Sequence, residues 1–142
     1  MTERSAVTVS ANRSPGIVVL KLAGTLDSLT YLEVRDIVIK AALDEPDAVL
    51  VDVNALAVPA HTAWTVFTSA RWHVSTWPDV PVILLCDNET ARADIKRSGV
   101  TRYVPVFSDL VAAEMSVGTA HRLRRRARAE MPASESCLPM GR

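Results

Sequence analysis

Three short aliphatic runs, separated by amphipathic segments, constrain the fold of this chain most strongly. The runs cover residues 17–22 (Ile-Val-Val-Leu-Lys-Leu), 48–53 (Ala-Val-Leu-Val-Asp-Val) and 80–86 (Val-Pro-Val-Ile-Leu-Leu-Cys). Such runs are typical of strands that are buried on both faces of a parallel sheet. Aromatic residues make up only 5% of the chain against 49% hydrophobic residues, so we expect an aliphatic core. An α/β domain follows.

The segments between these runs have helical periodicity. Residues 29–44 carry an apolar stripe, residues 61–76 carry a second one, and a third helix should begin at Asp87 or Asn88 and end at Ser98-Gly99. Asp27 or Ser28 is the expected N-cap of the first helix. The stripes are Val34, Ile37, Val38 and Ala41 in the first helix, and Ala63, Phe67, Ala70 and Val74 in the second. Single helices between strands predict right-handed crossovers in a mostly parallel sheet.

The two ends of the domain are set by turn and cap signals. Residues 6–11 and 17–22 flank Ser14-Pro15-Gly16 and predict a hairpin. Residues 103–107 predict a short edge strand because Pro105 cannot donate to a neighbour. A last helix should start after Ser108 or Asp109 and stop at Pro132. We therefore predict one domain over residues 6–130, with about four helices, and tails at 1–5 and 131–142.

Charge and composition argue against several classes of function. The 16 basic and 16 acidic residues give a net charge of +0. We interpret the arginines of residues 122–128 as a solvated helix end. Nucleic acid is therefore not an expected partner. The chain has no glycine-rich phosphate loop and no hydrolase elbow, and we expect no enzyme. No apolar run is long enough for a membrane span and no leader pattern is present, so we expect a cytoplasmic protein.

The cysteines and histidines of the sequence are not spaced for a metal site or a disulfide framework. Cys86 and Cys137 lie far apart, and the only histidines, His61, His73 and His121, are not spaced with them as a ligand set. We therefore predict no metal and no cofactor.

The order of elements and several local motifs together resemble the STAS domain of bacterial anti-sigma-factor antagonists. Residues 24–27, Gly-Thr-Leu-Asp, are similar to the G-x-L-D segment before the family's first helix, and residues 52–54, Asp-Val-Asn, are similar to its D-L-S after the central strand. Residues 82–85 occupy the next strand. The resemblance covers about residues 6–120 and implies a mixed, mostly parallel sheet with an N-terminal hairpin.

The resemblance also implies a binding surface and a phosphorylation site. In the antagonists the second helix opens with D-S-S-G-L or D-S-T-G-L, whose second hydroxyl residue is phosphorylated by a kinase-type anti-sigma factor. The matching stretch here is Ala60-His61-Thr62-Ala63-Trp64, so Thr62 is the candidate acceptor in a degenerate motif. The implied partner-binding residues are Asp27, Asn54, Ala60, His61, Thr62 and Trp64.

Several readings stay open at this point. Thr62 is either a phospho-acceptor or an ordinary first-turn threonine. We expect most of the three tryptophans, Trp64, Trp72 and Trp77, to be core residues. Trp64 is alternatively an anchor for a partner protein. The expected partner is an anti-sigma factor or a serine/threonine-kinase-type switch protein. The alternative function is a STAS-type scaffold or ligand-sensing module that binds a nucleotide or small anion at the same helix start. The sequence leaves the oligomeric state open, a homodimer included.

Overall fold

A five-stranded mixed sheet forms the centre of the molecule. The computed structural model describes residues 7–14 and 16–118. Strands β1 (Val7–Ser14), β2 (Ile17–Thr25), β3 (Ala48–Ala57), β4 (Val82–Leu85) and β5 (Val106–Phe107) lie in the order β1-β2-β3-β4-β5. β1 and β2 form an antiparallel hairpin, and the remaining neighbours are parallel. The predicted fold class, the order of strands and helices along the chain and the N-terminal hairpin are confirmed.

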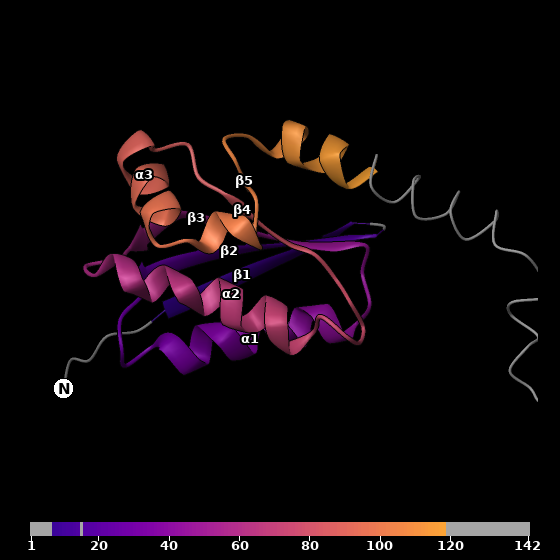
Figure 1. Cartoon of the computed structure of the whole chain (residues 1–142). Helices are drawn as coiled ribbons and strands as arrows, with labels where there is room; N and C mark the ends of the chain where they lie inside the picture. Colours follow the sequence, from indigo (N-terminus) through magenta and orange to yellow (C-terminus); the bar gives the residue numbers. More distant parts are fainter. Residues whose placement is uncertain (1–6, 15, 119–142) are drawn as a thin grey trace, which may run out of the picture.

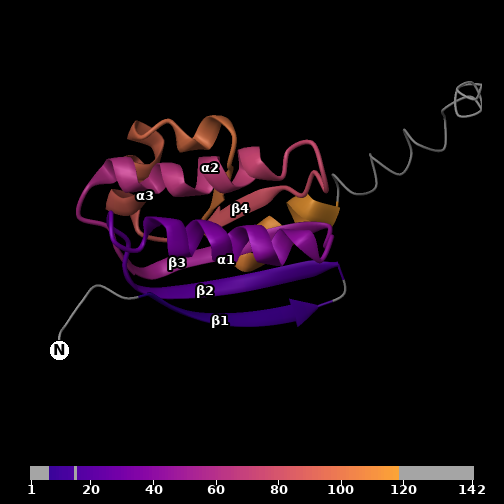
Figure 2. The ribbon, with the colours of Figure 1, turned by 90° about the horizontal axis from the view of Figure 1, so that it is seen from below.

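Helices cover both faces of this sheet (Figures 1 and 2). Helices α1 (Tyr31–Leu43), α2 (Thr65–His73) and α3 (Glu89–Arg97) cover one face, with the short 3-10 helices η1 (His61–Trp64) and η2 (Val100–Arg102) beside α2 and α3. Residues 110–118 form a further helix on the opposite face. The alternation of side chains along the strands therefore divides the core into two layers.

The two layers differ in size. The larger contains alternate residues of β2, β3 and β4 packed against α1, α2 and α3, with Phe67 and Val34 fully buried. The smaller contains Leu50 and Ile83 under Ala113 and Val117. This arrangement explains why the central runs are apolar at successive positions, since both faces of the central strands are covered.

Two glycines occupy positions that need their conformational freedom. Gly16 in the hairpin has φ 82°, and a Cβ added there would lie 2.5 Å from Asp47 Oδ2. Gly99, with φ 86°, follows α3 as the sequence predicts.

Two predicted helix caps are confirmed. Asn88 caps the start of α3, where its side chain accepts a hydrogen bond from Ala91 N. Asp109 Oδ1 accepts a hydrogen bond from Ala112 N at 2.7 Å at the start of the last helix.

Several predicted boundaries are wrong by a few residues. The first strand extends beyond residue 11 to Ser14, the fourth covers only Val82–Leu85 instead of 80–86, and the fifth covers only Val106–Phe107 instead of 103–107. β3 continues through 54–57, beyond the predicted strand run of 48–53, because these residues pair with β2 beyond a register shift. The second helix begins as η1 and ends at His73, short of the predicted residue 76.

The start of α1 also differs from the prediction. The N-cap is Thr30, not Asp27 or Ser28, and it makes no side-chain cap hydrogen bond. Asp27 Oδ1 instead accepts from Leu29 N at 2.9 Å and Thr30 N at 3.2 Å, so its carboxylate closes a turn just before the helix. The predicted tails at 1–5 and 131–142, the arginines of 122–128 and the stop at Pro132 lie outside the described residues.

Candidate partner-binding site

The carboxyl ends of β2 and β3 bring the predicted site residues to one edge of the sheet. The loop after β2 leads into α1 and the loop after β3 leads into η1, and both helices begin at the left-hand end of the molecule in Figure 1. Leu26 N donates to Ala57 O at 2.8 Å, which ties the two loops together. Ligands and partners of parallel α/β folds commonly bind at this edge.

Thr62 lies on the surface of this edge. It is the second residue of η1 and is exposed, as are its neighbours Ala60 and His61. Within residues 7–14 and 16–118, the Thr62 hydroxyl makes no hydrogen bond. An exposed hydroxyl without an intramolecular partner is accessible to an incoming enzyme or binding protein.

A short hydrogen-bond chain connects Thr62 to the first helix. Thr65 Oγ1 lies 2.7 Å from the Thr62 carbonyl oxygen, to which it donates, and 3.1 Å from Tyr31 Oη. Tyr31 opens α1 and Thr65 opens α2. The starts of the two helices are therefore held at a fixed spacing beside Thr62.

Asp27 and Asn54 act within the protein at this edge. Asp27 closes the turn before α1, as described above. The Asn54 side chain donates through Nδ2 to Asp52 Oδ1 at 2.9 Å and accepts through Oδ1 from Asp87 N at 2.9 Å. Asn54 thus links the end of β3 to the loop that precedes α3.

The tryptophans are distributed differently from the prediction. Trp64 is 2% exposed and packs in the core against Phe67, so its indole is a core residue and not a surface anchor in this conformation. Trp72 and Trp77 are 60% and 61% exposed, which makes the prediction that most of the tryptophans are core residues wrong. Trp72 lies two residues after Ala70, which belongs to the buried stripe of α2. Residues that share a helix face are three or four positions apart, so Trp72 points away from the core.

Sequence reasoning missed two exposed leucines at this edge. Leu29 precedes α1 and is 75% exposed, and Leu32 in its first turn is 61% exposed. Both lie outside the stripe that contains Val34 and Val38. The sequence signal for such exposed leucines is an apolar residue near the start of a helix that does not fall on the helix's buried stripe.

A cavity of about 270 Å³ lies beside the site, between the ends of β3 and β4 and the start of α3. Its lining includes Trp64, Cys86, Asn88 and Thr90. Burial raises the pKa of the Cys86 thiol, and a hydrogen bond to the Asn88 backbone and the charge of Arg92 oppose that effect. In the part of the chain that the structure describes, no group of three or more His, Cys, Asp or Glu side chains is arranged to hold a metal ion.

No helix of the described chain has the length and apolarity needed to cross a membrane.

The fold is similar to that of several solved structures, anti-sigma-factor antagonists among them. An antagonist from Mycobacterium paratuberculosis aligns with a TM-score of 0.66 at 16% identity, over 79% of this chain and 94% of its own. A variant of RsbS from Moorella thermoacetica aligns with a TM-score of 0.64 at 14% identity, over 80% and 97%. The antagonist SpoIIAA in its unphosphorylated form aligns with a TM-score of 0.59 at 16% identity, over 78% and 97%.

The sequence itself matches one family model. A search of curated proteins finds no match to this chain. The model of the STAS domain matches residues 8–113, which contain all five strands and the first three α-helices, apart from the first residue of β1. The chain is therefore a member of the STAS domain family.

Proposed function

We propose that this protein is an anti-sigma-factor antagonist-like regulator that works by binding another protein and not by catalysis. Its partner is an anti-sigma factor or a serine/threonine-kinase-type switch protein in the cytoplasm. Binding occurs through the loop after β3 and the start of the second helix, and occupation of the partner frees a sigma factor. The observation that carries the proposal is the exposed, unbonded Thr62 hydroxyl at the position of the family's phospho-acceptor.

The surroundings of Thr62 support a protein-binding surface. Leu29 and Leu32 expose apolar area at the start of α1, and His61 exposes a polar ring beside Thr62. Apolar anchors surrounded by polar groups are typical of protein interfaces. The Tyr31–Thr65 contact holds the starts of the two helices together beneath this surface.

Phosphorylation would act on the partner and leave the fold intact. A phosphate adds about −1.5 to −2 charge and at Thr62 would stand just before α2, where the helix dipole favours an anion. A partner packed on the same surface would have to desolvate that charge, so its affinity would fall. Two versions of the function follow: a switch that uses Thr62, and a constitutive binder in which Ala60 and Ala63 have removed the features that a kinase reads.

Site-specific photo-crosslinking tests this proposal. A benzoylphenylalanine placed at His61 should form a covalent product with an anti-sigma factor or kinase in the native cell, identified by mass spectrometry. The matched control is the same probe at Val9, which is 44% exposed on the edge strand β1. Products with such a partner from both positions, or from neither, would contradict the proposed surface.

Phosphate mapping separates the two versions. Mass spectrometry of the protein from its native cytoplasm should find phosphate on Thr62 if the switch operates. Thr62 free of phosphate under all growth conditions, together with a crosslinked partner, identifies the constitutive binder.

The cavity beside the site favours one second candidate, a ligand-sensing module. It lies at the carboxyl ends of β3 and β4, where small ligands bind in parallel α/β folds. Calorimetry with nucleotides and with inorganic phosphate tests it. Heat of binding that is lost in Asn88→Ala would support this candidate, and the absence of heat at high concentration would oppose it.

A further inference from the structure

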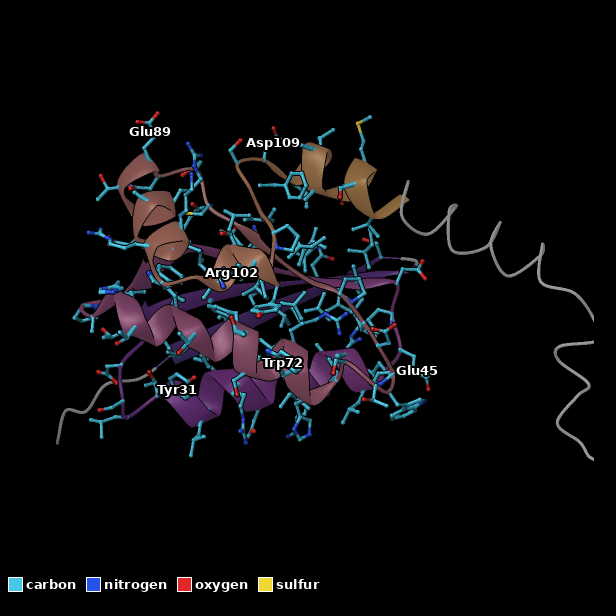
Figure 3. The ribbon with its side chains drawn as sticks, viewed as in Figure 1. Tyr31, Glu45, Trp72, Glu89, Arg102 and Asp109 are labelled. Atoms are coloured by element: carbon cyan, nitrogen blue, oxygen red, sulfur yellow. The ribbon has the colours of Figure 1, made fainter. Side chains whose placement is uncertain are left out.

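A groove runs along the outer side of α2, between α2 and η2. Two adjoining hollows of about 440 Å³ and about 300 Å³ share Trp72, Arg102 and Tyr103 in their walls. The first extends to Tyr31 and Thr65 at the start of the two helices, and the second extends past the C-terminal turn of α2. Figure 3 labels Trp72 on α2 and Arg102 on η2, above α2 in that view. The three shared residues make the two hollows one continuous groove.

An exposed aromatic pair forms the centre of the groove. The rings of Trp72 and Tyr103 are 5.6 Å apart between centroids and inclined by 57°, so they stabilise each other in an aromatic contact. Trp72 nevertheless remains 60% exposed and Tyr103 49% exposed. Tryptophan, tyrosine and arginine are the residues most enriched among those that dominate protein-binding energy.

The groove carries one unused guanidinium, that of Arg102. Arg102 is exposed, and its guanidinium makes no ion pair or hydrogen bond with the described residues. Arg71 Nη2 pairs with Asp79 Oδ1 at 3.0 Å, while Arg71 Nη1 is buried without an acceptor. The Arg102 guanidinium is thus free, while that of Arg71 is paired with Asp79, so a carboxylate that reaches Arg102 is the complementary group.

We infer that this groove binds an acidic segment of a partner protein. A carboxylate of the segment pairs with Arg102, and an adjacent apolar side chain packs on Trp72 and Tyr103. A single free arginine beside an aromatic pair matches one or two carboxylates on a peptide. It does not provide the row of cations that phosphate-backbone binding requires.

The groove is a second binding surface that does not depend on the function proposed for Thr62. Trp72 follows Thr62 by ten residues, which places it roughly 15 Å further along the helix axis. Binding in the groove should therefore be the same in Thr62→Glu as in wild type. A failure of the groove and a failure of the Thr62 surface remain distinguishable.

Selection from a phage-displayed library of random 12-residue peptides tests the inference with the full-length protein. The selected peptides should be enriched in Asp and Glu next to an aliphatic or aromatic residue. Synthetic copies should bind more weakly at high salt because an ion pair with Arg102 is screened. In NMR spectra the indole N–H signal of Trp72, assigned with Trp72→Phe, should shift on binding while that of Trp77 stays in place.

Matched variants decide the outcome. Trp72→Ala and Arg102→Glu should each weaken binding about tenfold or more. Trp77→Ala removes an equally exposed tryptophan, and Lys40→Glu makes the same change in net charge on α1, so both should bind as wild type does.

Four results would overturn the inference. The first is a selection that yields no acidic peptides, and the second is a peptide that binds Trp72→Ala as tightly as wild type. The third is a dimer of this protein, seen by sedimentation, that depends on Trp72 and blocks peptide binding. The fourth is binding of the protein to phosphatidylserine vesicles, and not to peptides, that depends on Trp72.

Discussion

Asn54 uses its side-chain amide to hold two loops at the edge of the sheet where Thr62 lies. Its Oδ1 accepts from Asp87 N and its Nδ2 donates to Asp52 Oδ1. Asp27 has a comparable role in the turn before α1. These polar residues fix the backbone around the candidate site, and Thr62 and His61 present free side chains on it.

Asn54→Ala should lower the free energy of unfolding by about 1 kcal/mol, because it removes two hydrogen bonds at a position where water replaces them in part. Urea denaturation measures the change. The control is Asn12→Ala on the exposed edge strand β1, which should leave stability close to wild type. Equal losses in the two variants would show that the Asn54 contacts contribute nothing specific.

Cys86 gives a prediction about pH. Burial raises the pKa of its thiol above the ordinary value for a cysteine, so the folded state favours the protonated form. Its contribution to stability is present below the pKa of the unfolded thiol and is lost as pH rises through the folded value. Unfolding free energies should therefore fall more steeply at alkaline pH in wild type than in Cys86→Ala.

Alkylation provides an independent check on Cys86. Iodoacetamide should modify it slowly in the native protein at mildly alkaline pH and quickly in concentrated urea, with peptide mass spectrometry separating Cys86 from Cys137. Fast native modification would contradict the burial of the thiol.

Residue roles were predictable from sequence where local chemistry decides them. Asn88 and Asp109 cap their helices as predicted because capping depends on neighbours within one turn. The exposure of Trp72 was not predictable, since it depends on whether η2, about 30 residues later in the chain, covers that face of α2. The same holds for Trp64, which the core encloses.

At the scale of elements, the helix over residues 110–118 covers the smaller face of the sheet. Ala113 and Val117 are buried against β3 and β4, and Val111 and Met115 face away. The order of strands and helices was predictable because each element buries a periodic stripe. The extension of β3 to Ala57 was not, because Asn-Ala-Leu-Ala has little intrinsic strand preference and pairs only where β2 lies beside it.

Two substitutions in this helix test its packing. Val117→Asp buries a carboxylate at a position 5% exposed and should destabilise the protein by about 3 kcal/mol or more. Val111→Asp places the same side chain at a position 65% exposed and should change stability by less than about 0.5 kcal/mol. Urea midpoints that move together would mean that the helix does not cover this face in solution.

At the scale of the whole molecule, the STAS fold presents two surfaces from one layer of helices. The starts of α1 and η1 form the surface around Thr62, and the outer side of α2 with η2 forms the aromatic groove. The first could be predicted from the motif that precedes the second helix. The second could not, because its residues come from segments that only the tertiary structure brings together.

The central claim is tested most directly by identifying the proteins that co-purify with the tagged protein from its native cytoplasm. The wild-type protein is compared with Thr62→Ala, Thr62→Glu and Thr8→Glu. Thr8 is an exposed threonine on β1, so Thr8→Glu controls for the added charge. We predict that an anti-sigma factor or kinase accompanies wild type, Thr62→Ala and Thr8→Glu and is lost with Thr62→Glu. Recovery of no such partner with any form, or equal recovery with all four, would contradict the assignment of this surface as an anti-sigma-factor antagonist site.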